Sequence, residues 1–346
     1  MIGAPPSRRR VAVVTGAGLV ALVAAVACGL GVGPTPIGLG RIATSILADL
    51  GLGHRTLSPL DATIVWQLRA PRMVLGLLVG AMLAVAGGTY QGVFRNPLAD
   101  PYLLGVAAGA GLGATIAIVD VGGGLATPTW TPALAFVGAL GAVALTWVVG
   151  GRGAHAGPST LILGGVAVAA LLTSAQTFLQ QQGSPTSIAR VYIWLLGSLA
   201  TASWSSVLLV LPYVAVCASV CVAAGRALDV LSVGEDESRS LGLPVSRVRL
   251  VVVAASSLGT AAVVSVAGLI GFVGIIVPHL VRLLVGTSYR RILPLSVLVG
   301  AAFLVLCDTV ARTVLAPSEL PLGVVTAVVG APAFVVVLSL RRRTVT

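Results

Sequence analysis

The stretch MVLGLLVGAMLAVAGGTYQGVF, residues 73–94, contains no charged residue, and the polar turn RNPLADP, residues 95–101, follows it directly. A helix needs about 20 consecutive apolar residues to cross the hydrocarbon core of a membrane. The two prolines of the turn forbid a continuous helix through it. This part of the chain therefore predicts a membrane-spanning helix that ends in a rigid polar segment.

The composition extends this interpretation to the whole chain. Of the 346 residues, 57% are hydrophobic and 9% are charged, whereas soluble domains contain about 25% charged residues. A membrane β-barrel would instead show alternating strands of about ten residues. The 43 glycines and the alanine-rich runs favour helices that approach each other closely through small side chains. We predict one all-α, polytopic membrane domain over residues 1–346.

Ten apolar runs are long enough to be membrane spans. They are residues 11–33, 73–94, 102–119, 131–150, 161–179, 206–224, 250–267, 269–285, 292–314 and 322–340. If both termini are cytoplasmic, 15 of the 21 arginines fall on the inner side of the membrane, as the positive-inside rule requires. We therefore predict a multi-pass protein of the plasma (inner) membrane with cytoplasmic N- and C-termini.

The charged and sulfur-containing residues exclude several kinds of function. All 21 basic residues are arginines, and a P-loop needs a lysine to reach the β- and γ-phosphates of ATP. Any ATP-driven work must then come from partner subunits, so we expect neither an enzymatic activity nor a cofactor in this chain. The arginines lie at the ends of apolar runs rather than on one face, which argues against nucleic acid as a partner. The four cysteines lack an accompanying histidine cluster, so no metal site is expected.

Two interrupted stretches favour a transport pathway. They are residues 95–101 and residues 268–279, where glycines are closely spaced within an apolar run. Non-helical backbone at membrane depth is tolerated only against protein or along a water-filled path. Asp308, in the ninth run, is a further candidate, either as a functional carboxylate or as the partner of Arg312 one helical turn later.

Two polar connections are longer than turns, namely the outer segment 35–67 and the inner segment 226–249. Within the inner one, residues 229–244 predict two short helices, broken at Gly234 and at Gly242. Composition alone favours a solvated loop slightly over a functional contact there.

Six motifs together give the chain a resemblance to a known family. They are QLRAPR (67–72), GGTYQ (87–91), NPLADP (96–101), Gly234-Glu235 with Leu241-Gly242, GFVG (271–274) with Pro278-His279, and ELPLGVVT (319–326) with GAP (330–332). In this order and spacing, from about residue 60 to about residue 340, the chain resembles the permease subunit of ABC importers for iron-siderophore, haem and cobalamin. The resemblance implies the ten-helix fold of type II ABC importer permeases.

The resemblance also implies a set of partners. A second permease copy would complete a homodimer, two cytoplasmic ATPase subunits would bind ATP and magnesium, and an extracytoplasmic binding protein would deliver the cargo. Membrane lipid would surround the dimer. The family places its coupling helices, which transmit closure of the ATPase, at residues 229–244, around Gly234, Glu235, Leu241 and Gly242.

Three arginines match the family positions that meet glutamates of the binding protein, namely Arg69, Arg72 and Arg312. The planar guanidinium suits this role because it binds a carboxylate through two hydrogen bonds. Arg69 and Arg72 could instead anchor the end of a span at the lipid headgroups. Arg312 could instead pair internally with Asp308 or with Glu319.

Four further residues match the family pattern. Asn96, Leu98 and Ser159 correspond to positions that narrow the cytoplasmic end of the pathway. His279 follows a signature proline, and we expect it to pack between helices rather than bind a ligand.

The family resemblance predicts an importer permease for ferric siderophores. Haem and cobalamin are near alternatives, because cargo specificity in this family resides mostly in the binding protein. The rival hypothesis is a proton- or sodium-driven secondary transporter, in which Asp308 would titrate during transport. A membrane scaffold or receptor without substrate flux is a third.

Overall fold

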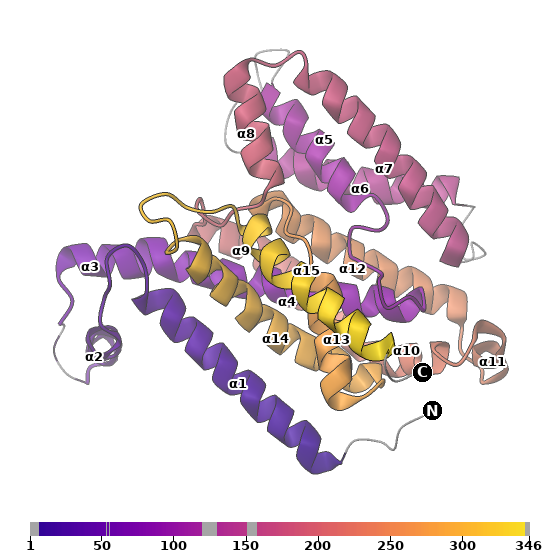
Figure 1. Cartoon of the computed structure of the whole chain (residues 1–346), viewed down its shortest axis with the longest axis horizontal. Coiled ribbons are helices and arrows are strands. Elements are labelled where there is room, and N and C mark those ends of the chain that lie inside the picture. The colour runs from indigo at the N-terminus through magenta and orange to yellow at the C-terminus, as the bar shows by residue number, and fades with distance from the viewer. Residues whose placement is uncertain (1–6, 53, 55, 120–129, 151–157, 343–346) are drawn as a thin grey trace.

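The computed structural model describes residues 7–52, 54, 56–119, 130–150 and 158–342, and Figure 1 shows the arrangement of its helices. Within these residues there is no β-strand, which confirms the predicted all-α class. Each of the ten predicted spans overlaps one helix. These helices are α1 (Arg8–Gly31), α4 (Ala70–Val93), α5 (Val106–Val119), α6 (Trp130–Val149), α7 (Pro158–Gln180), α9 (Trp204–Ala223), α12 (Val245–Ala267), α13 (Val273–Val285), α14 (Tyr289–Ala311) and α15 (Leu322–Arg342).

The helices differ in length. Seven of those in the described ranges are long and apolar enough to cross a membrane, whereas α5 has 14 residues and α13 has 13. At a rise of 1.5 Å per residue, α5 and α13 are about 20 Å long, which is shorter than the hydrocarbon core of about 30 Å. Helix α5 follows the first interrupted stretch and α13 begins within the second, so non-helical backbone takes up the missing depth.

Helix α4 forms the centre of the bundle. It packs against α9, α12, α13 and α14, and 19 of its 24 residues are buried. A Cβ atom at Gly80 would lie 2.2 Å from the carbonyl oxygen of Gly300 on α14. A Cβ at Gly87 would lie 2.0 Å from the carbonyl oxygen of Gly274 on α13. Glycine is therefore required at both crossings, as expected for membrane helices that associate through small residues.

Helix α1 lies at the edge of the bundle. Only four of its 24 residues are buried, and it packs mainly along α14. Its remaining apolar side chains would face lipid in a membrane.

The two ends of the bundle carry different short helices (Figure 1). The described end of α15 lies near α10 (Gly225–Leu231) and α11 (Glu235–Ser240), and we call this the terminal end. The opposite end, which we call the distal end, carries α2 (Leu39–Asp49), α3 (Pro59–Thr63) and α8 (Pro185–Leu195).

The distal helices are the main addition to the sequence prediction. The connection expected over residues 35–67 contains α2, α3 and a π-helical segment, η1 (Ile64–Arg69), that leads directly into α4. Ser58 and Ser184 cap α3 and α8 through their hydroxyls, and a proline follows each serine. This Ser-Pro pattern is typical of a helix start. It is the local signal that could have predicted both helices.

Candidate functional site

The two interrupted stretches meet in the interior of the bundle. A Cβ atom at Gly274 would lie 2.4 Å from Cδ of Pro101, so the two segments touch without a side chain between them. The Tyr102 hydroxyl donates to the carbonyl oxygen of Ile270 and accepts from its backbone N–H, with both distances 3.0 Å. The stretches singled out by sequence therefore form one joined element, which we call the central junction (residues 95–102 and 268–275).

A polar side chain supplies hydrogen bonds to backbone carbonyl groups of the central junction. Gln91 of α4 donates its side-chain amide to the carbonyl oxygens of Gly274 and Ile275, each at 3.3 Å. Phe272 has a φ of +69°, in the left-handed region that rarely holds a side chain. The segment thus turns sharply into α13 while its carbonyl groups keep partners, as backbone within a membrane requires.

Asp100 is the acidic residue of the central junction. Its Oδ1 accepts a hydrogen bond of 2.7 Å from the Tyr102 backbone N–H. The carboxylate therefore holds the turn in place.

The predicted cytoplasmic constriction residues lie where helices end or begin at the terminal end. The Asn96 side chain accepts a hydrogen bond of 2.9 Å from the Leu98 backbone N–H, which closes a local turn. Leu98 is exposed, and Ser159 is exposed in the first turn of α7. The narrowing role of these three residues stays a prediction.

Residues 229–244 contain the two short helices expected from sequence. Helix α10 ends before Gly234, which has a φ of +151°, and α11 ends before Gly242, which has a φ of +80°. Ser238 is fully buried and donates its hydroxyl to the Val230 carbonyl at 2.9 Å, so the two helices form one packed unit.

This unit, the α10–α11 unit, presents an apolar surface at the terminal end. Leu241 is 70% exposed and Val233 is 66% exposed. Glu235 instead faces inward, because it pairs with Arg249 at the start of α12 and with Arg239 one turn along α11. Among the predicted coupling residues, Leu241 is therefore positioned for contact with a partner, and Glu235 attaches the unit to the bundle.

A polar chain connects α10 to the central junction. Asp229 accepts hydrogen bonds from the Ser288 hydroxyl, at 2.7 Å, and from the Tyr289 backbone N–H, so it caps α14. Arg282 of α13 donates to the Tyr289 hydroxyl at 2.9 Å and to Gln91 at 3.3 Å. Gln91 in turn holds the carbonyl groups of the junction. Neither Asp229 nor Arg282 had a predicted role. For Arg282, its position as a charged residue within the apolar helix α13 was the available signal.

The three predicted docking arginines lie at the distal end, where Arg69 and Arg312 are buried and Arg72 is half-buried, and all three bind groups of this chain. Arg69 donates to the carbonyl oxygens of Leu30 and Gly31 at 2.8 and 3.1 Å, and to that of Thr35. The first two carbonyls belong to the last turn of α1, where a cation is favourable.

Arg72 forms the strongest ion pairs of this cluster. Its Nε and Nη2 atoms lie 2.9–3.0 Å from the Asp308 carboxylate, which is 6% exposed. Its two Nη atoms each donate at 2.9 Å to Glu319, which is 36% exposed. Arg72 thus joins a buried carboxylate of α14 to a carboxylate at the surface.

Arg312 and His279 also lie inside the bundle. The Arg312 side chain donates to the Gly29 carbonyl of α1, and its Nε lies 3.9 Å from Asp308. Of the two internal partners considered for Arg312, Asp308 is the one within reach. The His279 ring lies edge-on to Phe334, with the centroids 6.5 Å apart, as expected of a helix-packing residue.

Comparison with known proteins identifies the family. A cobalamin import permease, BtuC, of Halobacterium salinarum is 44% identical over 80% of this chain and 73% of its own length. The vitamin B12 import permease BtuC of Escherichia coli is 38% identical over 86% of this chain and 92% of its own length. An uncharacterized ABC transporter permease of Bacillus subtilis, YvrB, is 39% identical over 82% of this chain and 81% of its own length.

Solved structures agree with the sequence relatives. An inward-facing metal-chelate type ABC transporter superposes with a TM-score of 0.82 at 30% identity, over 94% of this chain and 98% of the other. PsaBC of Streptococcus pneumoniae, with a TM-score of 0.54 at 15% identity over 80% of this chain and 93% of the other, shares the fold. The family model for the FecCD transport family matches residues 21–340. The chain therefore belongs to the FecCD transport family of membrane permeases.

Proposed function

We propose that this chain is the permease subunit of an ATP-driven ABC importer for a metal chelate, with cobalamin as its first candidate cargo. The observation that carries the proposal is the family match over residues 21–340, together with 44% identity to a cobalamin permease. The family resemblance alone predicted ferric siderophores first. The relatives with a stated cargo favour cobalamin instead, and ferric siderophores and haem stay as the alternatives.

The proposed assembly is a homodimer with two ATPase subunits at the terminal end, which would face the cytoplasm. The exposed side chains of Val233 and Leu241 supply an apolar contact there, and closure of the ATPase would displace the α10–α11 unit. Asp229 and Glu235 fix this unit to α14 and α12. A displacement would reach the central junction through these contacts.

The binding protein would dock at the distal end, and Arg72 is the arginine best placed to take part. Arg69 and Arg312 direct their side chains to carbonyl groups of this chain. Arg72 binds Asp308 on its inner side, whereas the Glu319 carboxylate on its other side is partly exposed. A glutamate of a partner could replace Glu319 without leaving Asp308 unpaired. In this proposal Glu319 occupies the docking position while the binding protein is absent.

Reconstitution in nanodiscs tests the proposal. The permease is combined with a candidate ATPase and binding protein, and ATP hydrolysis and uptake are measured with cobalamin, a ferric siderophore or haem. We expect stimulation by one of the three, with cobalamin first. Uptake that follows a proton gradient without any ATPase, and fails in Asp308→Asn, would contradict the proposal and support a secondary transporter. The ion pair between Asp308 and Arg72 already gives this carboxylate a structural role.

A pair of matched leucine variants tests the coupling surface. Leu241 on the α10–α11 unit and Leu60 on α3 are both 70% exposed, at opposite ends of the bundle. Leu241→Glu should prevent co-purification of the ATPase subunits, because it places a charge in an apolar contact. Leu60→Glu should leave co-purification unchanged. Equal behaviour of the two variants would place the ATPase contact elsewhere.

A further inference from the structure

Two cavities at the distal end form one groove. The first has a volume of 350 Å³ and the second 810 Å³, and both lie beside the outer parts of α6 and α12. They share four lining residues, namely Thr131, Trp194, Thr201 and Val266. We call the combined feature the distal groove.

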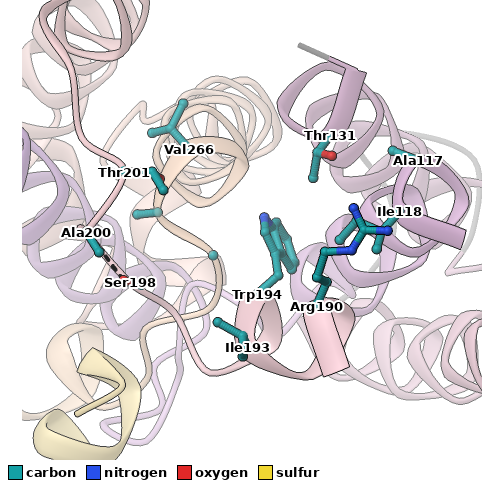
Figure 2. Close-up of a pocket in the computed structure, with 12 residues that line it drawn as sticks. Ala117, Ile118, Thr131, Arg190, Ile193, Trp194, Ser198, Ala200, Thr201 and Val266 are labelled. Carbon is teal, nitrogen blue, oxygen red and sulfur yellow. Dashed lines mark hydrogen bonds between the residues drawn. The ribbon is translucent and has the colours of Figure 1, made fainter. Parts of the chain in front are cut away.

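The distal groove has a polar mouth. Figure 2 shows Arg190 and Trp194, both from α8, within the first cavity, with Ile118 and Thr131 beside Arg190. Arg190 is exposed, and its guanidinium donates a long hydrogen bond of 3.4 Å to the Ser187 hydroxyl. Among the described residues that line the two cavities there is no carboxylate. The mouth therefore carries a net positive charge.

The rest of the distal groove is mostly apolar, with the hydroxyls of Ser205, Ser206 and Ser265 as its polar part. Its walls are Phe136 of α6, Leu209 and Tyr213 of α9, and Ala262 and Val266 of α12. Along α9 the lining extends from Ser205 to Tyr213, which is about 12 Å at 1.5 Å per residue. That length corresponds to most of one leaflet of the hydrocarbon core, which is about 15 Å deep.

The surface around the groove is the kind that lipid covers. On α6, Val137 is exposed, and on α9 Leu208 and Val216 are exposed. All three are large apolar side chains on helices long and apolar enough to span a membrane. Chains of the surrounding bilayer therefore reach the groove without crossing polar surface.

We propose that the distal groove binds an anionic phospholipid. One acyl chain would lie between α6, α9 and α12, and the phosphate would lie at Arg190. Three observations support this ligand class: an elongated apolar groove of one-leaflet depth, a single cation at its mouth, and flanking side chains suited to lipid. An arginine binds phosphate through paired hydrogen bonds, and tryptophan is typical of the membrane interface. The inference uses the membrane location of the chain and is independent of its cargo.

Quenching of Trp194 fluorescence by brominated lipids tests the proposal. Trp194 lines both cavities, and the four other tryptophans can be replaced by phenylalanine in the full-length chain. The protein is placed in phosphatidylcholine nanodiscs with increasing fractions of brominated phosphatidylglycerol or brominated phosphatidylcholine. We expect half-quenching at an about fivefold lower fraction of the anionic lipid, the factor that one arginine near an anionic surface supplies. Equal half-quenching fractions in this parent protein would overturn the proposal.

Two variants separate the headgroup from the acyl chain. Arg190→Gln should remove the preference for phosphatidylglycerol and leave the quenching by phosphatidylcholine unchanged. Ala133→Phe should reduce quenching by both lipids, since Ala133 lines the apolar part of the groove. Ala144→Phe is its matched control, because Ala144 is exposed on the same helix outside the groove. A preference that survives Arg190→Gln, or equal effects of the two phenylalanine variants, would refute the assignment.

A competition experiment distinguishes the lipid from a free anion. Inorganic phosphate at millimolar concentration should not change the half-quenching fraction of phosphatidylglycerol. Loss of the preference in phosphate, at constant ionic strength, would identify a free-anion site at Arg190 and overturn the lipid assignment.

Discussion

Replacement of Arg72 by methionine should strongly destabilise the protein. The substitution keeps an unbranched chain as far as the position of Nε and leaves the Asp308 carboxylate, 6% exposed, without its bidentate partner. Removal of one member of a buried ion pair costs about 3–5 kcal/mol when the remaining charge has no other partner, and the longer 3.9 Å contact with Arg312 places the expected loss at the lower end, about 3 kcal/mol. Glu319→Gln should cost about 1 kcal/mol or less, since Glu319 is 36% exposed.

A double-mutant cycle distinguishes the ion pair from a simple packing effect. The double variant with Arg72→Met and Asp308→Asn should be more stable than Arg72→Met alone, because no buried carboxylate remains. We therefore expect a coupling free energy of at least about 2 kcal/mol, near the upper part of the range for contacting residues. The measurement is denaturant-induced unfolding in detergent, followed by fluorescence. A loss below about 0.5 kcal/mol for Arg72→Met, or additive effects in the double variant, would refute the reasoning.

Three further predictions follow from other parts of the structure. Gly80→Leu should prevent assembly of the bundle, because a Cβ there would lie 2.2 Å from the backbone of α14. Gly16→Leu is the control, because a Cβ at Gly16 would meet no atom within 4 Å, and this variant should elute as one peak in size-exclusion chromatography. Asp229→Asn should lower the free energy of unfolding by about 1.5–3 kcal/mol, because charge-assisted hydrogen bonds are lost. It should also raise the number of ATP molecules hydrolysed for each cargo molecule imported. Asp236→Asn, at an exposed position, should do neither. Asp100→Ala should cost about 1.5–3 kcal/mol in the same unfolding assays, because it removes the acceptor of the Tyr102 backbone N–H, whereas Asp100→Asn, which keeps an acceptor oxygen, should cost less.

The spans could be predicted from sequence because their signal depends on length and composition alone. Every apolar run found in this way overlaps a helix. The starts of α5 and α13 were predicted too early, since Tyr102 and Ile270 belong to non-helical backbone held by tertiary hydrogen bonds. Helix α8 was not predicted, because its 11 residues lack the length of a span and its Ser-Pro cap is a weak local signal.

The arginine cluster shows the limit of sequence for the candidate site. A guanidinium among apolar residues must find an acceptor, and the sequence predicts this need correctly. Whether the acceptor is on the same chain depends on contacts between residues far apart, such as Arg72 with Asp308, 236 positions later. Arg69 is a still clearer case, since its acceptors are backbone carbonyls. Every residue has a backbone carbonyl, so the sequence does not indicate which of them accepts the hydrogen bond.

The central junction explains how a movement at the terminal end could change the interior of the bundle. Gly87 and Gly274 touch backbone to backbone, so α4 and α13 cannot approach further, and a push on either must be transmitted as a displacement. Gln91 lies one turn from this crossing, where it binds both the junction and Arg282. If the polar chain from Asp229 carries the motion, loss of its charge should uncouple hydrolysis from import while the helices stay assembled. If close packing alone carries it, Asp229→Asn should lower stability and leave the ratio of ATP hydrolysed to cargo imported unchanged.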